Sequence, residues 1–121
     1  MKFYLFMSDK LATYFDSEIL DADVAFKLKF YQQSWRHLER AHILGQPYPY
    51  AHTLVHWKML IFGFKTKNFK EIIGQIPRLL IGGVKSFAGQ IPIGNTGGVN
   101  VPPLKPMEIP EDLMKIIKSS T

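Results

Sequence analysis

Residues 35–57 read WRHLERAHILGQPYPYAHTLVHW and contain all four histidines of the protein, His37, His42, His52 and His56. The middle of this stretch, GQPYP at 45–49, cannot continue a helix, because proline lacks the backbone N–H and its ring clashes with the preceding turn. The flanks carry apolar residues at helical spacing. The stretch therefore predicts two helices joined by a tight hinge, with Gly45 in the left-handed conformation that ends the first.

Helical periodicity continues outward from this hinge in both directions. The predicted helices cover residues 8 to about 26, 33–44, 50–64 and 69–81. Ser8 and Asn68 are suitable N-caps, and Pro77 should bend the last of these helices. The residues predicted to face inward are Leu11, Tyr14, Phe15, Ile19 and Leu20, then Trp35, Leu38, Ala41, His42 and Leu44, then Leu54, Trp57, Leu60 and Ile61.

The composition changes after these helices. Residues 88–110 are rich in glycine and proline, which excludes regular helix or sheet, yet they are too apolar for a disordered tail. We predict an ordered arm here and a short final helix at 111–118, with acidic residues at its start and lysines near its end. Residues 1–121 then form one all-α domain, in which residues 8–87 build stacked antiparallel hairpins. A weak internal similarity between segments 34–38 residues apart gives these hairpins a tetratricopeptide-like spacing.

Overall composition narrows the classes of function. The 121 residues include no cysteine, which excludes disulfides and thiolate metal sites. The formal net charge is +5, and much of the excess lies in one segment that holds Lys65, Lys67, Lys70 and Arg78. A solvated basic face explains this segment better than nucleic-acid binding. With neither a convincing secretory leader nor an apolar run long enough for a membrane span, we expect a cytoplasmic protein.

Four separated blocks of sequence are distinctive together. They are HLERAHILGQ at 37–46, HTLVHW at 52–57, GQIPR at 74–78, and GNTGGVNV at 94–101 followed by KPMEIPEDL at 105–113. In this order they resemble the small bacterial proteins grouped as domain of unknown function 3703, over residues 33–113. The resemblance implies a shared fold and shared sites. It implies no particular activity.

The histidines predict a metal site across the hinge. Glu39 and His42 are three residues apart and share one helix face, and His52 and His56, four apart, share another. Reflection about Pro47 places His42 opposite His52 and Glu39 opposite His56. Imidazole and carboxylate ligands suit a divalent transition metal such as zinc, copper, iron or nickel. His37 should point elsewhere, and the lack of a second ExxH motif argues against a di-iron site.

A purely structural interpretation competes with the metal site. In it, His42 and His52 bond carbonyl groups of the hinge, and Glu39 pairs with Arg36 or Arg40. No nucleophile or second carboxylate stands nearby in sequence, so we predict no catalytic residues and favour a protein that is not an enzyme. The alternative function is a tetratricopeptide-like module that binds another protein, with structural histidines and no metal.

A second candidate site lies in the predicted arm. Its residues are Gly94, Asn95, Thr96, Gly97 and Gly98. Successive backbone N–H groups of such a segment can form a nest for an anion. The segment lacks the Gly-Lys-Ser/Thr ending of a phosphate-binding loop, and a tight turn that fixes the arm is the competing explanation.

Overall fold

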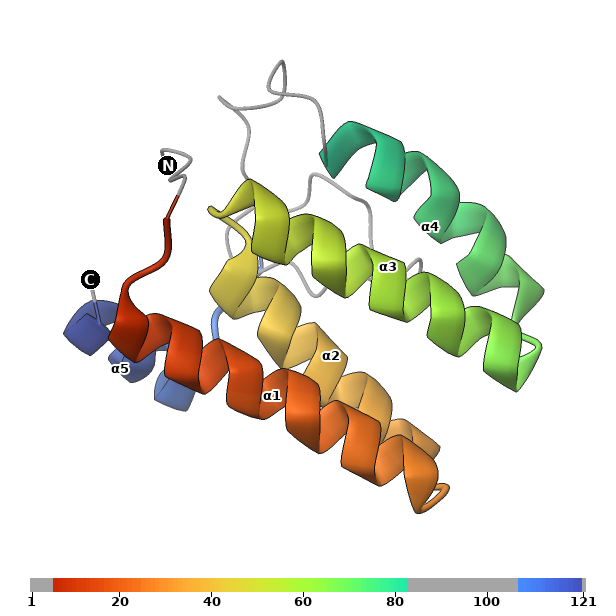
Figure 1. Ribbon diagram of the computed structural model, residues 1–121, viewed down its shortest axis with the longest axis horizontal. Helices are drawn as coiled ribbons and strands as arrows, with labels where there is room; N and C mark the ends of the chain where they lie inside the picture. Colours follow the sequence, from red (N-terminus) through yellow and green to blue (C-terminus); the bar gives the residue numbers. More distant parts are fainter. Residues whose placement is uncertain (1–5, 83–106, 121) are drawn as a thin grey trace.

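The computed structural model describes residues 6–82 and 107–120, and every regular element in these ranges is a helix (Figure 1). The five helices are α1 (Asp9–Lys27), α2 (Tyr31–Gly45), α3 (Pro49–Thr66), α4 (Phe69–Gly82) and α5 (Glu111–Ser120). The predicted all-α class is confirmed. The ends of the four main helices lie within two or three residues of the ends predicted from the periodicity.

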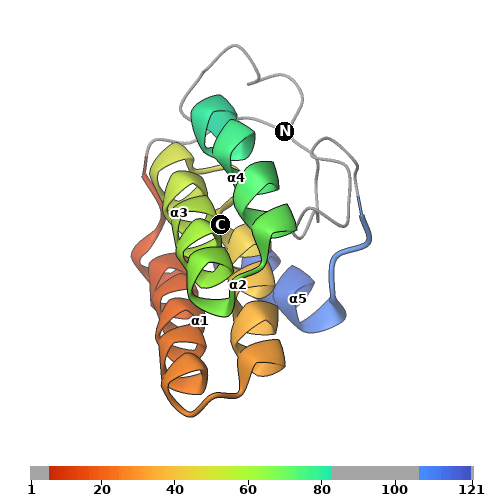
Figure 2. The same ribbon diagram turned by 90° about the vertical axis from the view of Figure 1, so that its right-hand side faces the viewer.

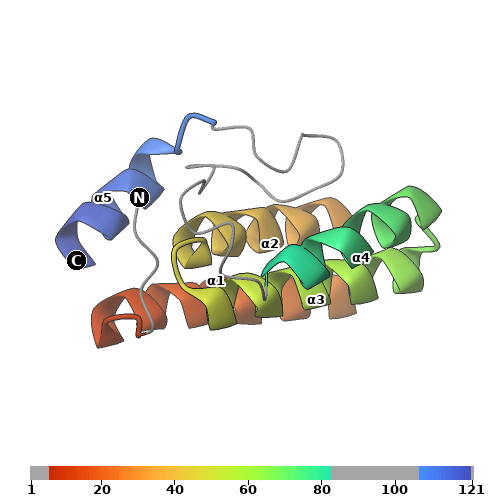
Figure 3. The ribbon, with the colours of Figure 1, turned by 90° about the horizontal axis from the view of Figure 1, so that it is seen from above.

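The helices form two antiparallel hairpins in two layers. α1 pairs with α2 and α3 pairs with α4, and the short corner at residues 46–48 joins the hairpins (Figure 1). The two rotated views place α1 and α3 in one layer and α2 and α4 in the other, with α5 beside α2 (Figures 2 and 3). The corner therefore sets the C-terminal end of α2 against the N-terminal half of α3.

Local chemistry explains most helix ends. The Ser8 hydroxyl accepts a hydrogen bond from the backbone N–H of Leu11 at 3.2 Å, and Asn68 Oδ1 accepts one from the N–H of Glu71, also at 3.2 Å. Both predicted N-caps are thus confirmed. Lys67, with a φ of 57°, supplies the left-handed residue that closes α3.

The prediction that Gly45 ends α2 in a left-handed conformation was wrong. It is the last helical residue, and the next residue, Gln46, has a right-handed φ of −56°. The glycine is needed for space instead, because a Cβ atom built on it would lie 2.8 Å from Phe15 Cε2 and 3.0 Å from Ala51 Cβ. α1, α2 and α3 therefore approach most closely at this point.

The core fills the space between α1, α2 and α3. Its buried apolar residues include Leu11, Phe15, Ala22, Leu38, Ala41, Leu44, Ala51, Val55, Met59 and Leu113. Tyr14, Leu20 and Trp57 were predicted to face inward but are 40%, 61% and 52% exposed. Leu20 is nine residues, or two and a half helical turns, from buried Leu11 and therefore faces away from the core, and single exposed apolar side chains of this kind are common on protein surfaces.

An ion-pair network fastens α5 to the first hairpin. Arg40 on α2 donates hydrogen bonds to Glu18 on α1 at 2.9 Å and to Asp112 on α5. Asp112 raises the pKa of Arg40, and Arg40 in turn lowers the pKa of Asp112. At the other end of α5, the Ser8 hydroxyl donates to the Ser120 carbonyl oxygen at 2.6 Å. The final helix is therefore part of the fold, as predicted.

Some predictions fall outside the described residues. Most of the predicted arm, and the whole candidate anion nest at residues 94–98, lie there. Pro77 is inside α4, as predicted. None of the helices in residues 6–82 and 107–120 combines the length and apolarity needed to cross a membrane.

Candidate metal centre

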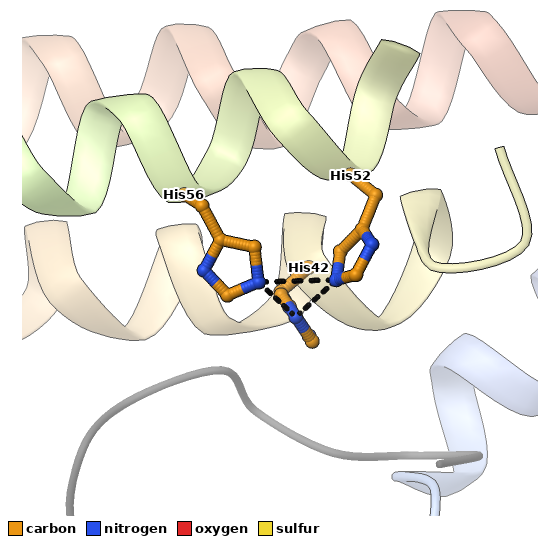
Figure 4. A group of neighbouring side chains, drawn as sticks. All are labelled: His42, His52 and His56. Carbon is orange, nitrogen blue, oxygen red and sulfur yellow. Dashed lines mark hydrogen bonds between the residues drawn. The ribbon is translucent and has the colours of Figure 1, made fainter. Parts of the chain in front are cut away.

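Three histidines meet where the two hairpins join. His42 comes from the last turn of α2, and His52 and His56 come from successive turns of α3 (Figure 4). His42 and His56 are buried, at 2% and 3% exposure, and His52 is half-buried. The corner at 46–48 folds α3 back along α2, and the four-residue spacing puts both α3 histidines on the face that meets His42.

The three Nε2 atoms form a nearly equilateral triangle. The distance is 3.0 Å between His42 and His52, 3.0 Å between His52 and His56, and 3.1 Å between His42 and His56 (Figure 4). Neighbouring rings meet edge to face, with interplanar angles of 62–78°. One nitrogen of each ring therefore points at a common centre.

Hydrogen bonding among the three rings cannot satisfy this triangle. In a neutral imidazole each ring nitrogen is either an N–H donor or a lone-pair acceptor. Each of the three nitrogens is either a donor or an acceptor, so at least two of them are of the same type. At least one of the three contacts therefore places two N–H groups or two lone pairs against each other. Three lone pairs that converge at this distance could instead hold a cation.

The triangle has nearly the size that a metal ion requires. With bonds of about 2.0–2.1 Å, one ion could reach all three nitrogens at once. Ideal tetrahedral angles would need the nitrogens only about 0.3 Å farther apart, a shift that side-chain torsions can supply. Among the described residues, no aspartate, glutamate or fourth histidine places a ligand atom in this group.

The surroundings keep His52 in the form that binds metals. Burial of the ring, followed by its electrostatic interaction with His56, lowers the pKa of His52 from 6.5 to about 3. The ring is therefore neutral near pH 7, and a neutral imidazole is the ligand form.

The other sequence-predicted residues lie outside this triangle. Glu39, half-buried one turn before His42, is not in the group of converging ligand atoms. Arg40, one of the partners suggested for Glu39, pairs with Glu18 and Asp112. His37 bonds Glu18 through Nδ1 at 2.8 Å and so points away from the site, as predicted.

Two residues of α4 that periodicity did not single out stand behind His56. Gln75 is fully buried and its Oε1 lies 2.6 Å from His56 Nδ1, while its Nε2 donates to Glu71 Oε2 at 3.0 Å. Glu71 is itself buried, at 7% exposure. The feature of the sequence that could have identified this contact was Gln75 itself, a polar residue within the apolar run that begins at Ile72.

The sequence profile of one family matches nearly the whole chain. The family is described as protein of unknown function (DUF3703), and the match covers residues 9–117, so the chain belongs to this family. The resemblance seen in the sequence blocks is thereby confirmed and now includes α1. No curated protein and no solved structure matches the chain.

Proposed function

We propose that this DUF3703 protein binds one divalent transition-metal ion through Nε2 of His42, His52 and His56. The observation that carries the proposal is the triangle of nitrogens 3.0–3.1 Å apart, which hydrogen bonds among the rings cannot satisfy. Three neutral nitrogen donors without a thiolate suit zinc, copper, nickel or iron. Glu39, predicted from sequence as a fourth ligand, is not in the group of converging ligand atoms.

Three protein ligands leave room for an exogenous one. Structural zinc sites usually close with four protein ligands, whereas three ligands and a water are typical of sites that exchange or activate what they bind. The fourth position of a metal held by the three histidines would be open to water or another small ligand. Since no general base or nucleophile is assigned to that position, metal binding rather than catalysis is the function proposed.

The test is metal analysis of protein purified without a histidine tag. Elemental analysis should find a transition metal near one equivalent, and zinc added to stripped protein should raise its melting temperature. At a free zinc concentration 100 times the dissociation constant, the gain is about 2.7 kcal/mol, or roughly 10 °C for a chain of this length. Cobalt should give the visible bands of a low-symmetry nitrogen site.

Matched variants locate the effect. His52→Ala, in a half-buried position, should abolish the zinc-dependent gain with little harm to the fold, and His42→Ala should abolish it as well. His37→Ala is the control, because His37 lies outside the triangle and should leave the gain intact. Protein without metal that shows no shift with zinc, copper, nickel or iron would refute the proposal.

The alternative function is the tetratricopeptide-like interaction module. This module is favoured by a hollow of about 530 Å³ between the start of α2 and the end of α3. The hollow is lined in part by Tyr31, Trp35 and Phe62. Binding of a protein there should not depend on metal. Trp35→Ala should then weaken capture of that partner while His52→Ala leaves it unchanged, and the opposite pattern would count against the module.

A further inference from the structure

Gln75 contacts a metal ligand from the side opposite the candidate metal. Its carbonyl oxygen lies 2.6 Å from His56 Nδ1, and the pair is buried between α3 and α4. A carbonyl oxygen can only accept, so the hydrogen of this bond must be on Nδ1. The neutral ring then has its lone pair on Nε2, the atom that points into the triangle.

Glu71 determines which way the Gln75 amide faces. The Gln75 NH₂ group donates to Glu71 Oε2 at 3.0 Å and also lies 3.5 Å from Met59 Sδ. A flipped amide would turn its oxygen toward the carboxylate, which would place two acceptors against each other at about the distance of the present bond. The buried carboxylate therefore favours the orientation in which the amide oxygen faces His56 Nδ1.

We propose that Gln75 and Glu71 are positioning residues that hold His56 as the Nδ1–H tautomer, so that its Nε2 is ready to bind a metal before the metal arrives. The consequence for metal binding rests on the proposed function, whereas the tautomer of His56 is a property of the metal-free protein. Partners of this kind, on the far nitrogen of a ligating histidine, orient the ring and raise its basicity. Here an amide connects the carboxylate to the histidine.

The chain of hydrogen bonds from Glu71 through Gln75 to His56, called the relay below, also links a third helix to the site. Glu71 and Gln75 are one helical turn apart, and Glu71 lies in the first turn of α4. α4 thus contacts the site through His56 of α3, which faces His42 of α2. A metal held by the triangle would connect three helices through one chain of polar contacts.

The first experiment reads the tautomer directly. Imidazole nitrogen shifts of metal-free protein, measured by NMR at pH 7, should show His56 with a protonated Nδ1 and a lone pair on Nε2. Gln75→Leu keeps the bulk but removes the acceptor, so the His56 shifts should move toward a mixture of tautomers. Met59→Leu is the control, since it removes only the sulfur contact with Gln75 and should leave the shifts unchanged.

The second experiment tests the direction of the relay by exchange of its two residues. In the double variant Glu71→Gln, Gln75→Glu, a carboxylate accepts from His56 and an amide donates to that carboxylate, which preserves the chain of bonds. Gln75→Leu should weaken zinc binding by about 10- to 100-fold, as is usual for such partners, and the double variant should recover most of the loss. A merely structural role of Gln75 would not predict this recovery.

The outcomes separate the two proposals. A wild-type His56 that carries its proton on Nε2, or His56 shifts unchanged in Gln75→Leu, overturns the relay whether or not zinc binds. Failure of the double variant to regain zinc affinity, with its fold intact by circular dichroism, overturns the role of Glu71. The predicted tautomer in a protein that binds no metal would uphold the relay as a histidine-orienting device and overturn only the metal function.

Discussion

The close approach of three helices at Gly45 makes a sharp prediction about stability. In Gly45→Ala the new Cβ would lie 2.8 Å from Phe15 Cε2, about 0.6 Å short of ordinary contact, and 3.0 Å from Ala51 Cβ. Phe15 is a buried core residue and Ala51 is part of α3, so neither can withdraw freely. α1 and α3 must therefore move away from the end of α2.

The expected magnitude follows from two opposing effects. Overpacking a filled core costs about 1–3 kcal/mol, whereas alanine in place of glycine in a helix gains at most about 1 kcal/mol and less at the last residue. We expect Gly45→Ala to lose about 1–2 kcal/mol, or roughly 4–8 °C in melting temperature. Zinc affinity should fall as well, by about ten-fold, if some 1.4 kcal/mol of this strain falls on the ends of α2 and α3.

Gly63→Ala is the matched comparison. Gly63 is also buried and helical, but the contacts of a Cβ there would be longer, at 3.1 Å from Ile72 Cγ1 and 3.4 Å from Glu71 Cβ. Cost and gain should nearly cancel, and the melting temperature should stay within about 3 °C of wild type. Urea titrations of metal-free protein and zinc calorimetry on both variants would decide. Gly45→Ala as stable as Gly63→Ala would refute the packing argument.

Three further predictions concern stability. Ser8→Ala removes both the cap of Leu11 and the bond to Ser120, and should cost about 1–2 kcal/mol in urea titrations; a loss below 0.3 kcal/mol would contradict this. Leu113→Ala on α5 should cost about 2–5 kcal/mol, because the side chain is fully buried; an unchanged midpoint would show that α5 is not docked. Metal-free protein should lose stability as the pH falls below 6.5, by up to about 1.4 kcal/mol per pH unit, since unfolded His52 takes up a proton that the folded ring, with a pKa of about 3, refuses. Stability that is flat from pH 7 to pH 5 would contradict the last prediction.

The fold could be predicted from sequence because its signals are local. Helix-forming periodicity, the caps at Ser8 and Asn68, and the proline hinge each act over a few residues. The same hinge geometry correctly set His42 against His52. His56, one turn farther along α3, was predicted opposite Glu39 in the same ligand set, and in the structure it joins the triangle while Glu39 does not.

The rest of the site depends on how helices pack against one another, which periodicity does not encode. Gln75 contacts His56 only because α4 folds back on α3, and the depth and rotation of that contact are set by side chains on both helices. The same limit explains Gly45. Its sequence position suggests a helix stop, whereas its role is to make room for Phe15 from a helix 30 residues earlier.

The three ligands of the triangle come from residues no more than 14 positions apart. Loops of this length close in about 10–100 ns at small entropic cost, long before distant parts of a chain meet. The Ser8–Ser120 contact, by comparison, spans 112 residues and must form late. A metal bound as proposed would need only the corner between α2 and α3, so it would bind while the termini are still unfolded and act as a folding nucleus. Metal supply would then set how fast the chain folds as well as how stable it becomes.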